Sequence, residues 1–474
     1  MLKRIVLGII ALIVVLLVVV VGALVYLRIP QNASGMAAES VCSAAFMAGR
    51  SPDNLMEEDV LPASPALSAI SVDVNEDEKS VTAKFAGLFS RTASLLPDRG
   101  CVLDEPPAAG AEGFVINADA GADQSWPAGN APIPATDWDP AIDADRLNAA
   151  VDAAFVGAGD TAAANARGLA VVQDGKLLVL REAPGFAGTP LHGWSMTKTV
   201  GGMLAYKILT EKGIDLQTPV VDAFPAGNAP SWVAEWAQDE RREITVADLF
   251  YMRDGLKNRE GYGPTDPVVQ MLYGEPDMSG WAASFPAEEP AGSRWQYLSA
   301  TSNILAAVAR GQFASDEEYW SYPATALYDP VGLTTASLAT DTAGTWVSSS
   351  YLWATVPDWA RLGQLVLQDG QWEGEEVLPP GWLEFAGTSA LPDGDGAGYG
   401  AQTWIPANPV GGECRSTPGI PEDTVSMEGH WGQIVASVPS KDAVVVRLGW
   451  TFDRDQFDSC ALLSEVLSSL PDRN

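Results

Sequence analysis

The chain has 474 residues, of which 47% are hydrophobic and 19% are charged. That composition can build a large hydrophobic core, and it excludes an intrinsically disordered protein. The formal net charge of −33 is spread along the chain, so the surface repels nucleic acid and argues against a polyphosphate substrate held by basic residues.

The first predicted element is an apolar helix at the N-terminus. The run from Ile5 to Leu27 is unbroken, long enough to cross a bilayer, and longer than the apolar core of a cleaved signal peptide. We therefore expect residues 1–29 to form a retained single-pass anchor. Because Lys3 and Arg4 outweigh the lone Arg28, the N-terminus is expected in the cytoplasm and the remaining chain in the periplasm or another extracytoplasmic space. A cleaved signal sequence is the alternative.

Residues 30–135 are rich in Ala, Gly, Pro and acidic residues. Only the stretch from Val72 to Leu96 has the composition of regular structure, so we expect an accessory region that links the anchor to a catalytic unit. Asn32-Ala33-Ser34 matches a glycosylation sequon. A motif this short beside a membrane anchor is expected by coincidence, and we assign it no role.

All four cysteines lie beyond the anchor: Cys42, Cys101, Cys414 and Cys460. An even number in an oxidising compartment predicts two disulfides, and the sequence allows three pairings. Proximity along the chain favours Cys42 with Cys101 and Cys414 with Cys460. None has the spacing of metal ligands and the chain has only 2 histidines, so we expect no zinc site.

Residues 136–474 are expected to form the main domain, a mixture of helices and antiparallel strands. A helical pattern begins near Asp143, and another fills roughly residues 456–470. Two hairpins are predicted from paired apolar runs, namely Gly168–Val172 with Leu177–Leu180 and Ile434–Val438 with Ala443–Leu448. Strands from both ends of the domain can therefore share one sheet, and the helical stretches between them predict a subdomain with a cleft at its border.

The stretch from Ser195 to Lys198 lies where a glycine-containing extended segment turns into an amphipathic helix. Side chains three residues apart share one helical face, so the amine of Lys198 can contact the hydroxyl of Ser195. Backbone N–H groups at a helix start also favour a developing negative charge. We therefore predict Ser195 as a nucleophile with Lys198 as its base. The alternative is a triad with a histidine base, for which only His192 and His430 are available.

A lysine base needs a second proton carrier for the leaving group, and a tyrosine suits that task. Tyr297 lies in an extended segment that precedes a predicted helix. An isolated tyrosine is more often a core aromatic residue, so its assignment depends on the other motifs.

Three motifs occur in order along the chain: Ser195-Met-Thr-Lys198, Tyr297-Leu-Ser299 and Gly429-His-Trp-Gly-Gln433. Together they resemble the motifs of the serine β-lactamase and penicillin-recognising family, and more closely its class-C-like branch of esterases and 6-aminohexanoate-dimer hydrolases. The resemblance extends from about Asp143 to Leu470. It implies an α+β fold of the β-lactamase/transpeptidase type, in which helices flank an antiparallel sheet.

The resemblance also implies a role for each matching residue. Ser195 would be acylated, Lys198 would accept its proton, and Tyr297 would carry a proton to the leaving group and later activate water. The backbone N–H groups of Ser195 and Gln433 would bind the acyl oxyanion. The site is expected to need no metal ion and no organic cofactor.

Two departures from the family pattern affect the expected substrate. His430 stands where β-lactamases carry a lysine and is followed by Trp431 and Gly432. Without that lysine, only a protonated His430 could hold the carboxylate of a β-lactam. Ser299 stands where class C β-lactamases carry asparagine, and its hydroxyl can still hydrogen-bond a substrate amide or Lys198.

Two further features are expected to shape the cleft. Trp194 and Trp431 flank the catalytic candidates and can wall the cleft with apolar surface. The loop from Arg253 to Gln270 contains several glycines and Tyr262, and is a candidate lid.

We therefore expect a membrane-anchored, outward-facing serine hydrolase that cleaves a small amide or ester through an acyl-enzyme. A D-alanyl-D-alanine peptidase or β-lactamase is the first alternative, favoured by the compartment and disfavoured by the missing lysine. The second is a non-catalytic binder of cell-wall fragments.

Overall fold

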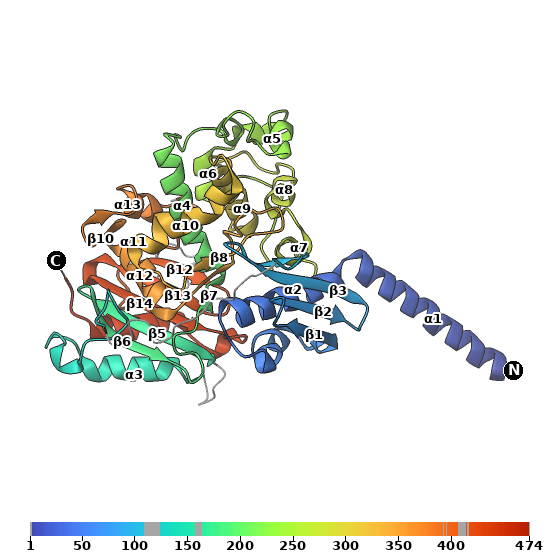
Figure 1. Cartoon of the computed structure of the whole chain (residues 1–474), viewed down its shortest axis with the longest axis horizontal. Coiled ribbons are helices and arrows are strands. Elements are labelled where there is room, and N and C mark those ends of the chain that lie inside the picture. Colours follow the sequence, from blue (N-terminus) through green and yellow to red (C-terminus); the bar gives the residue numbers. More distant parts are fainter. Residues whose placement is uncertain are drawn as a thin grey trace.

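The computed structural model describes residues 2–108, 124–156, 164–391, 393–394, 396–405, 414 and 417–473. Helix α1 (Leu2–Tyr26) projects from the rest of the molecule, with its apolar side chains exposed (Figure 1). Among the described helices it is the one long and apolar enough to cross a membrane. Its length, composition and position fit either an anchor or a signal sequence.

A small α/β unit follows α1. Helix α2 (Ile29–Cys42) packs against a four-stranded antiparallel sheet with the order β1-β2-β3-β4. Its strands are β1 (Ile70–Asn75), β2 (Ser80–Phe85), β3 (Phe89–Leu96) and β4 (Gly100–Leu103). Single helical turns occupy most of the chain between α2 and β1, and the disulfide Cys42–Cys101 ties α2 to β4.

This unit differs from the linker that the composition suggests. The strands were anticipated between Val72 and Leu96, whereas α2 was not, because its small residues give little apolar periodicity. Those small residues let α2 approach α7 closely, since a Cβ atom at Gly35 would lie 2.5 Å from the carbonyl oxygen of Tyr273. Asn32 of the sequon is only 2% exposed, in agreement with a coincidental match. Residues 109–123 of the predicted accessory region lie outside the described residues.

The main sheet has five antiparallel strands in the order β12-β13-β14-β5-β6. They are β5 (Ala166–Gln173), β6 (Lys176–Glu182), β12 (Val425–Gly429), β13 (Gln433–Val438) and β14 (Ala443–Gly449). Both predicted hairpins are present, and β14 pairs with β5, so strands from the two ends of the domain share one sheet. This agrees with the α+β architecture expected from the sequence.

Helices cover both faces of this sheet. Helices α3 (Ala144–Ala154) and α14 (Ser459–Ser469) pack together on one face, as Figure 1 shows for α3, and α12 (Val356–Leu367) packs on the other. Thr355 caps α12 by accepting from the N–H of Asp358. Gly363 brings α12 close to the strands, since a Cβ atom there would be 2.5 Å from Val444.

The remaining described helices form the predicted helical region. They are α4 (Thr197–Glu211), α5 (Ser231–Trp236), α6 (Val246–Phe250), α7 (Pro267–Gly274), α8 (Met278–Ala283), α9 (Ser299–Arg310), α10 (Asp316–Pro323), α11 (Asp329–Val331) and α13 (Trp382–Gly387). Short strands β7 (Leu191–His192), β8 (Ser337–Leu338) and β9 (Leu352–Ala354) form a small sheet, and β10 (Gln371–Trp372) pairs with β11 (Glu375–Glu376).

The second disulfide joins Cys414 to Cys460 at the start of α14. Both disulfides therefore follow the pairing that proximity along the chain favours, and both lie beyond α1. Disulfides of this kind are typical of domains that fold outside the cytoplasm.

Candidate active site

Ser195 lies in a single helical turn, Trp194–Met196, between β7 and α4. The turn is tight, because Trp194 adopts a positive φ of 50°. Gly193 before it has no room for a side chain, since a Cβ atom would be 2.2 Å from the ring of Trp359. Ser195 is 8% exposed and lines a cavity. The sequence placed this serine at the start of a helix, and it lies directly before one.

Lys198 lies one helical turn further along and is 1% exposed. Its Nζ donates to Ser195 Oγ at 2.8 Å, to Ser299 Oγ at 3.0 Å and to the carbonyl of Ser349 at 3.0 Å. Burial lowers the pKa of Lys198 to about 8, while the nearby charge of Glu260 opposes that shift. A lysine with this pKa is partly neutral near neutral pH and can accept a proton from the hydroxyl that it contacts.

Ser299, the first residue of α9, connects Lys198 to a carboxylate. Its hydroxyl donates to Glu260 Oε1 at 2.7 Å, and its backbone N–H donates to Glu260 Oε2 at 2.8 Å. Both oxygens of Glu260 are thus engaged at the start of a helix, where negative charge is favoured. The second predicted motif therefore lies beside the first, with Glu260 behind it.

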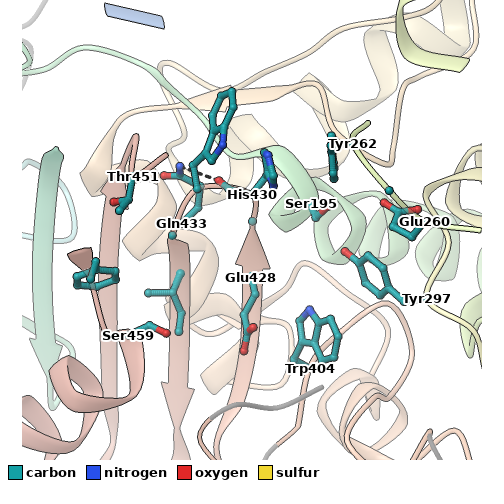
Figure 2. Close-up of a pocket in the computed structure, with 16 residues that line it drawn as sticks. Ser195, Glu260, Tyr262, Tyr297, Trp404, Glu428, His430, Gln433, Thr451 and Ser459 are labelled. Carbon is teal, nitrogen blue, oxygen red and sulfur yellow. Dashed lines mark hydrogen bonds between the residues drawn. The ribbon is translucent and has the colours of Figure 1, made fainter. Parts of the chain in front are cut away.

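Tyr297 lies two residues before α9, and its hydroxyl is directed towards Ser195 (Figure 2). Its ring lies 4.8 Å from Lys198 Nζ and stacks against the indole of Trp404, with ring centroids 5.1 Å apart. Burial raises the pKa of Tyr297 well above its usual value. The phenol is therefore protonated at neutral pH and can donate a hydrogen bond.

The third motif forms the turn between β12 and β13 and belongs to an aromatic cluster. The ring of His430 stacks on Tyr262 at a centroid distance of 4.1 Å. Trp194 meets His430 at 5.5 Å and Trp431 at 5.1 Å, both edge to face. Trp431 lines the cavity, whereas Trp194 is 2% exposed and is not among the described lining residues. Tyr262 belongs to the predicted lid loop, and its hydroxyl also interacts with Ser195.

The edge strand β12 determines which backbone N–H groups face the site. The N–H and C=O of Ser426 both bond to Trp404 outside the sheet, each over 2.9 Å. Alternate residues of an antiparallel strand point to opposite sides, so the N–H of His430 points to this same outer side. Gly429 lies against the carbonyl of Gly193, two residues before the nucleophile candidate, and a Cβ atom at Gly429 would be 2.3 Å from that oxygen.

Gln433 was expected to supply the second oxyanion donor, but it lies on β13, one strand further from Ser195 (Figure 2). It pairs with Gly429 in the hairpin, and by the same alternation its N–H faces β12. Its side chain donates to the carbonyl of His430 at 3.1 Å and accepts from the N–H of Gly449 at 2.9 Å. This geometry favours the N–H of His430 as the donor and gives Gln433 a supporting position behind the turn.

Comparison with known proteins bears on this arrangement. A family model described as Beta-lactamase matches residues 151–459, which is more than half of the chain. The chain belongs to the beta-lactamase family. Among curated protein sequences, none matches it.

Three solved structures are similar to this chain. A β-lactamase candidate from Bacteroides dorei is 16% identical with a TM-score of 0.54, covering 69% of this chain and 99% of that one. A penicillin-binding protein homologue from Caulobacter crescentus is 17% identical with a TM-score of 0.51, covering 72% and 99%. A 6-aminohexanoate-dimer hydrolase candidate from Bacillus anthracis is 21% identical with a TM-score of 0.49, covering 61% and 76%. The first two likenesses establish the fold.

The cavity of this beta-lactamase family member has a volume of about 500 Å³. It reaches from Ser195, Tyr262 and Tyr297 across the edge of β12 towards Phe457 and Ser459. Two of its described lining residues, Glu260 and Glu428, are acidic, and none of the described lining residues is lysine or arginine. Over the described parts of the chain, no cluster of His, Cys, Asp or Glu has the arrangement of a metal site.

His192, one candidate base of a triad, is 4% exposed and lies among aromatic rings. It stacks between Trp194 and Trp353 at centroid distances of 4.3 and 4.8 Å, and its Nε2 bonds to the carbonyl of Ser350. Burial lowers the pKa of His192 to about 3, so it stays neutral. Its surroundings fit a structural residue better than a catalytic base.

Several cavity residues were not assigned a role from the sequence, among them Glu260, Trp404 and Glu428. Glu260 belongs to the loop that glycine content marked as a lid, but no pattern in the sequence connects it to Ser299, 39 residues later. Glu428 directly precedes the third motif, so its position on the edge strand could have indicated a place in the site. Trp404 reaches the site because its backbone hydrogen-bonds to that of Ser426. No local sequence pattern predicts this pairing.

Proposed function

We propose that the protein is a serine hydrolase that cleaves a small amide or ester through an acyl-enzyme. The observation that carries the proposal is the contact of Lys198 Nζ with Ser195 Oγ at 2.8 Å, made by a buried amine whose pKa is lowered to about 8. Membership of the beta-lactamase family supports the same chemistry. Ser195 is the nucleophile, Lys198 its base, and Tyr297 the proton shuttle.

In acylation, neutral Lys198 takes the proton of Ser195 as Oγ attacks the carbonyl carbon of the substrate. The carbonyl oxygen becomes an oxyanion, which the N–H groups of Ser195 and His430 stabilise. As the bond to the leaving group breaks, Tyr297 gives its proton to the departing amine or alcohol and regains one from Lys198. Losing a single oxyanion donor typically costs about 100-fold or more in rate.

In deacylation, water attacks the ester formed at Ser195. Its proton passes to Tyr297 and Lys198, the ester bond breaks, and Ser195 recovers its proton as the acid product leaves. The network around Lys198 suits this return, because Ser299 Oγ and the carbonyl of Ser349 hold the amine in one place. No metal ion or organic cofactor enters either step.

The charge of the cavity supports a neutral or cationic substrate. Glu260 and Glu428 line it, and none of the described lining residues is lysine or arginine. A β-lactam carboxylate would meet two carboxylates there, which disfavours the β-lactamase and peptidase alternative.

The test is hydrolysis of 4-nitrophenyl esters, linear amides and a chromogenic cephalosporin, with mass spectrometry to detect an acyl group on Ser195. We expect turnover of esters or amides, an acyl adduct on the wild-type protein, and loss of both in Ser195→Ala. Ser321→Ala, on the exposed surface of α10, is the matched control and should keep full activity.

Unchanged turnover in Ser195→Ala would refute the proposal. A stable adduct with a fluorescent penicillin at Ser195 would instead support the peptidase alternative. If a fluorophosphonate probe failed to label the protein, a binder of cell-wall fragments would be the better interpretation.

We further propose that α1 is retained as an anchor with the catalytic unit outside the cytoplasm. The exposed apolar surface of α1 and the two disulfides beyond it support this arrangement. Membrane fractionation, with protease added to intact and to lysed cells, tests it. Release of a shortened soluble protein would indicate a cleaved signal sequence instead.

A further inference from the structure

Arg447 lies on β14 directly behind the turn of the third motif, and it is completely buried. Its Nη1 donates to the carbonyls of Gly432 at 2.7 Å and Trp431 at 3.4 Å. Its Nη2 donates to the carbonyl of Ala164 and to Thr451 Oγ1, both at 2.7 Å. Within the described residues, no carboxylate pairs with this guanidinium, so its partners there are neutral.

A buried cation without an anionic partner is costly. Desolvation of a charged side chain costs several kcal/mol, and a carboxylate usually offsets part of that cost. Burial accordingly lowers the pKa of Arg447, but a guanidinium remains charged at neutral pH. The ring of Phe457, 3.9 Å from the guanidinium carbon, and the carbonyls supply the compensation that is present.

The surrounding chain is shaped to fit this side chain. A Cβ atom at Gly432 would lie 2.6 Å from Nη1 of Arg447, and one at Gly449 would lie 2.4 Å from its Cζ. Any side chain at either glycine would therefore displace the guanidinium. The side-chain oxygen of Gln433, on the neighbouring strand β13, accepts a further hydrogen bond from the N–H of Gly449.

The turn that Arg447 supports has an unfavourable backbone conformation. Trp431 has a φ of 63° and Gly432 a φ of 84°, and the left-handed region is unfavourable for a non-glycine residue such as Trp431. Every carbonyl of the turn accepts a hydrogen bond from a residue outside it. The carbonyl of Trp431 accepts from Arg447 and from the N–H of Thr451 at 3.0 Å. The carbonyl of Gly432 accepts from Arg447, and that of His430 accepts from the side chain of Gln433. The conformation is thus maintained by donors outside the turn.

We propose that Arg447 is a positioning residue for acyl transfer: it fixes the turn that directs the His430 N–H at the oxyanion, and it adds positive charge behind that oxyanion. This inference rests on the proposed function of Ser195. The guanidinium acts through Trp431 and Gly432, whose carbonyls it contacts. Its charge lies in a dry interior, where charge acts over a longer range than in water. Both effects are stronger in the tetrahedral intermediate than in the bound substrate, so they raise kcat rather than lower KM.

The experiment compares Arg447→Lys and Arg447→Met with the wild type on 4-nitrophenyl butyrate. A second measurement is the inhibition constant of phenylboronic acid, which forms a tetrahedral adduct with a serine hydroxyl. For Arg447→Met we expect kcat to fall about 100-fold with KM nearly unchanged, and inhibition to weaken by a similar factor. Arg447→Lys keeps the charge but not the planar fork, and should recover part of that loss.

Arg241→Met is the matched control, because Arg241 is also buried and donates to the carbonyls of Ala283 and Phe285, in the helical region. It should lower thermal stability and leave kcat and the inhibition constant of the folded enzyme unchanged. If either folded Arg447 variant kept wild-type kcat and inhibition, the proposal would be wrong. If Arg447→Met does not fold, kcat and the inhibition constant of Arg447→Lys test the proposal instead. Full activity of Ser195→Ala would be a separate failure, that of the proposed function itself.

Discussion

The hydroxyl of Ser299 donates to Glu260 Oε1 over 2.7 Å. The same hydroxyl accepts from Lys198 Nζ over 3.0 Å, so the carboxylate lies one hydroxyl away from the proposed base. Its negative charge favours the protonated amine and raises the pKa of Lys198 against the larger effect of burial. Glu260 therefore helps to set the pH at which the site becomes active.

The first prediction follows for Glu260→Gln. Lys198 acts as a base only when neutral, so activity is gained as the pH rises through its pKa of about 8. Removing the charge of Glu260 lowers that pKa, and the acidic limb of the profile of kcat/KM against pH should move to lower pH. Glutamine keeps one acceptor for Ser299, which limits structural damage.

Glu317→Gln, on the exposed side of α10, is the control for this measurement and should leave the profile unchanged. A shift of the Glu260→Gln profile to higher pH would contradict this assignment. An unchanged pH profile of Glu260→Gln combined with a lower kcat would also contradict it, because Glu260 would then act by positioning Ser299 and not through its charge.

The second prediction concerns Tyr297→Phe. Tyr297 is proposed to protonate the leaving group, which an amine needs and a nitrophenolate does not, because nitrophenolate is already a stable anion. We expect the variant to lose about 100-fold or more in kcat on an amide, within the usual range for a general acid, and much less on a 4-nitrophenyl ester. Steady-state kinetics on both substrates check this. Tyr322→Phe on α10 is the control, and equal losses on the two substrates would count against a shuttle.

Sequence patterns anticipated the elements whose burial follows from local periodicity. The hairpins of β5 with β6 and β13 with β14 were recognisable because apolar runs flank turn residues such as Asp174 and Gly175. Likewise, the three-residue spacing of Ser195 and Lys198 was enough to predict their contact. These are properties of one short segment at a time.

The remaining features depend on contacts between distant segments. Helix α2 packs against α7 through a close approach at Gly35. The composition of this segment resembles that of a linker, so the sequence did not indicate the packing. The position of Glu260 follows from the path of an irregular loop, which no periodicity describes. Gln433 lines the cavity but stands on β13 rather than on the edge strand, because the motif gives the order of the residues and not the strand on which each one lies.

The third prediction concerns the N-terminal α/β unit. Asp59 forms ion pairs with Arg50 and with Arg167 of β5, and Asp59 and Arg167 are each only 3% exposed. The variant Asp59→Asn leaves two buried guanidinium groups without this carboxylate, which should cost about 3–5 kcal/mol of unfolding free energy. Urea denaturation of the chain lacking residues 1–27 measures this. Asp73→Asn, on exposed β1, should change stability by no more than about 0.5 kcal/mol. A linker without structural function would give equal results for both variants.

The fourth prediction concerns Gly429→Ala, which tests the contact between β12 and the turn of the nucleophile. A Cβ atom at Gly429 would lie 2.3 Å from the carbonyl oxygen of Gly193, so the edge strand must move away from Ser195. That movement displaces the His430 N–H from the oxyanion, and we expect kcat to fall about 100-fold or more while labelling of Ser195 by a fluorophosphonate slows in parallel. Gly387→Ala at the end of α13 is the matched control, because its Cβ would meet Val425 at an ordinary 3.7 Å. If Gly429→Ala kept wild-type kcat and labelling rate, the edge strand would not supply the oxyanion donor.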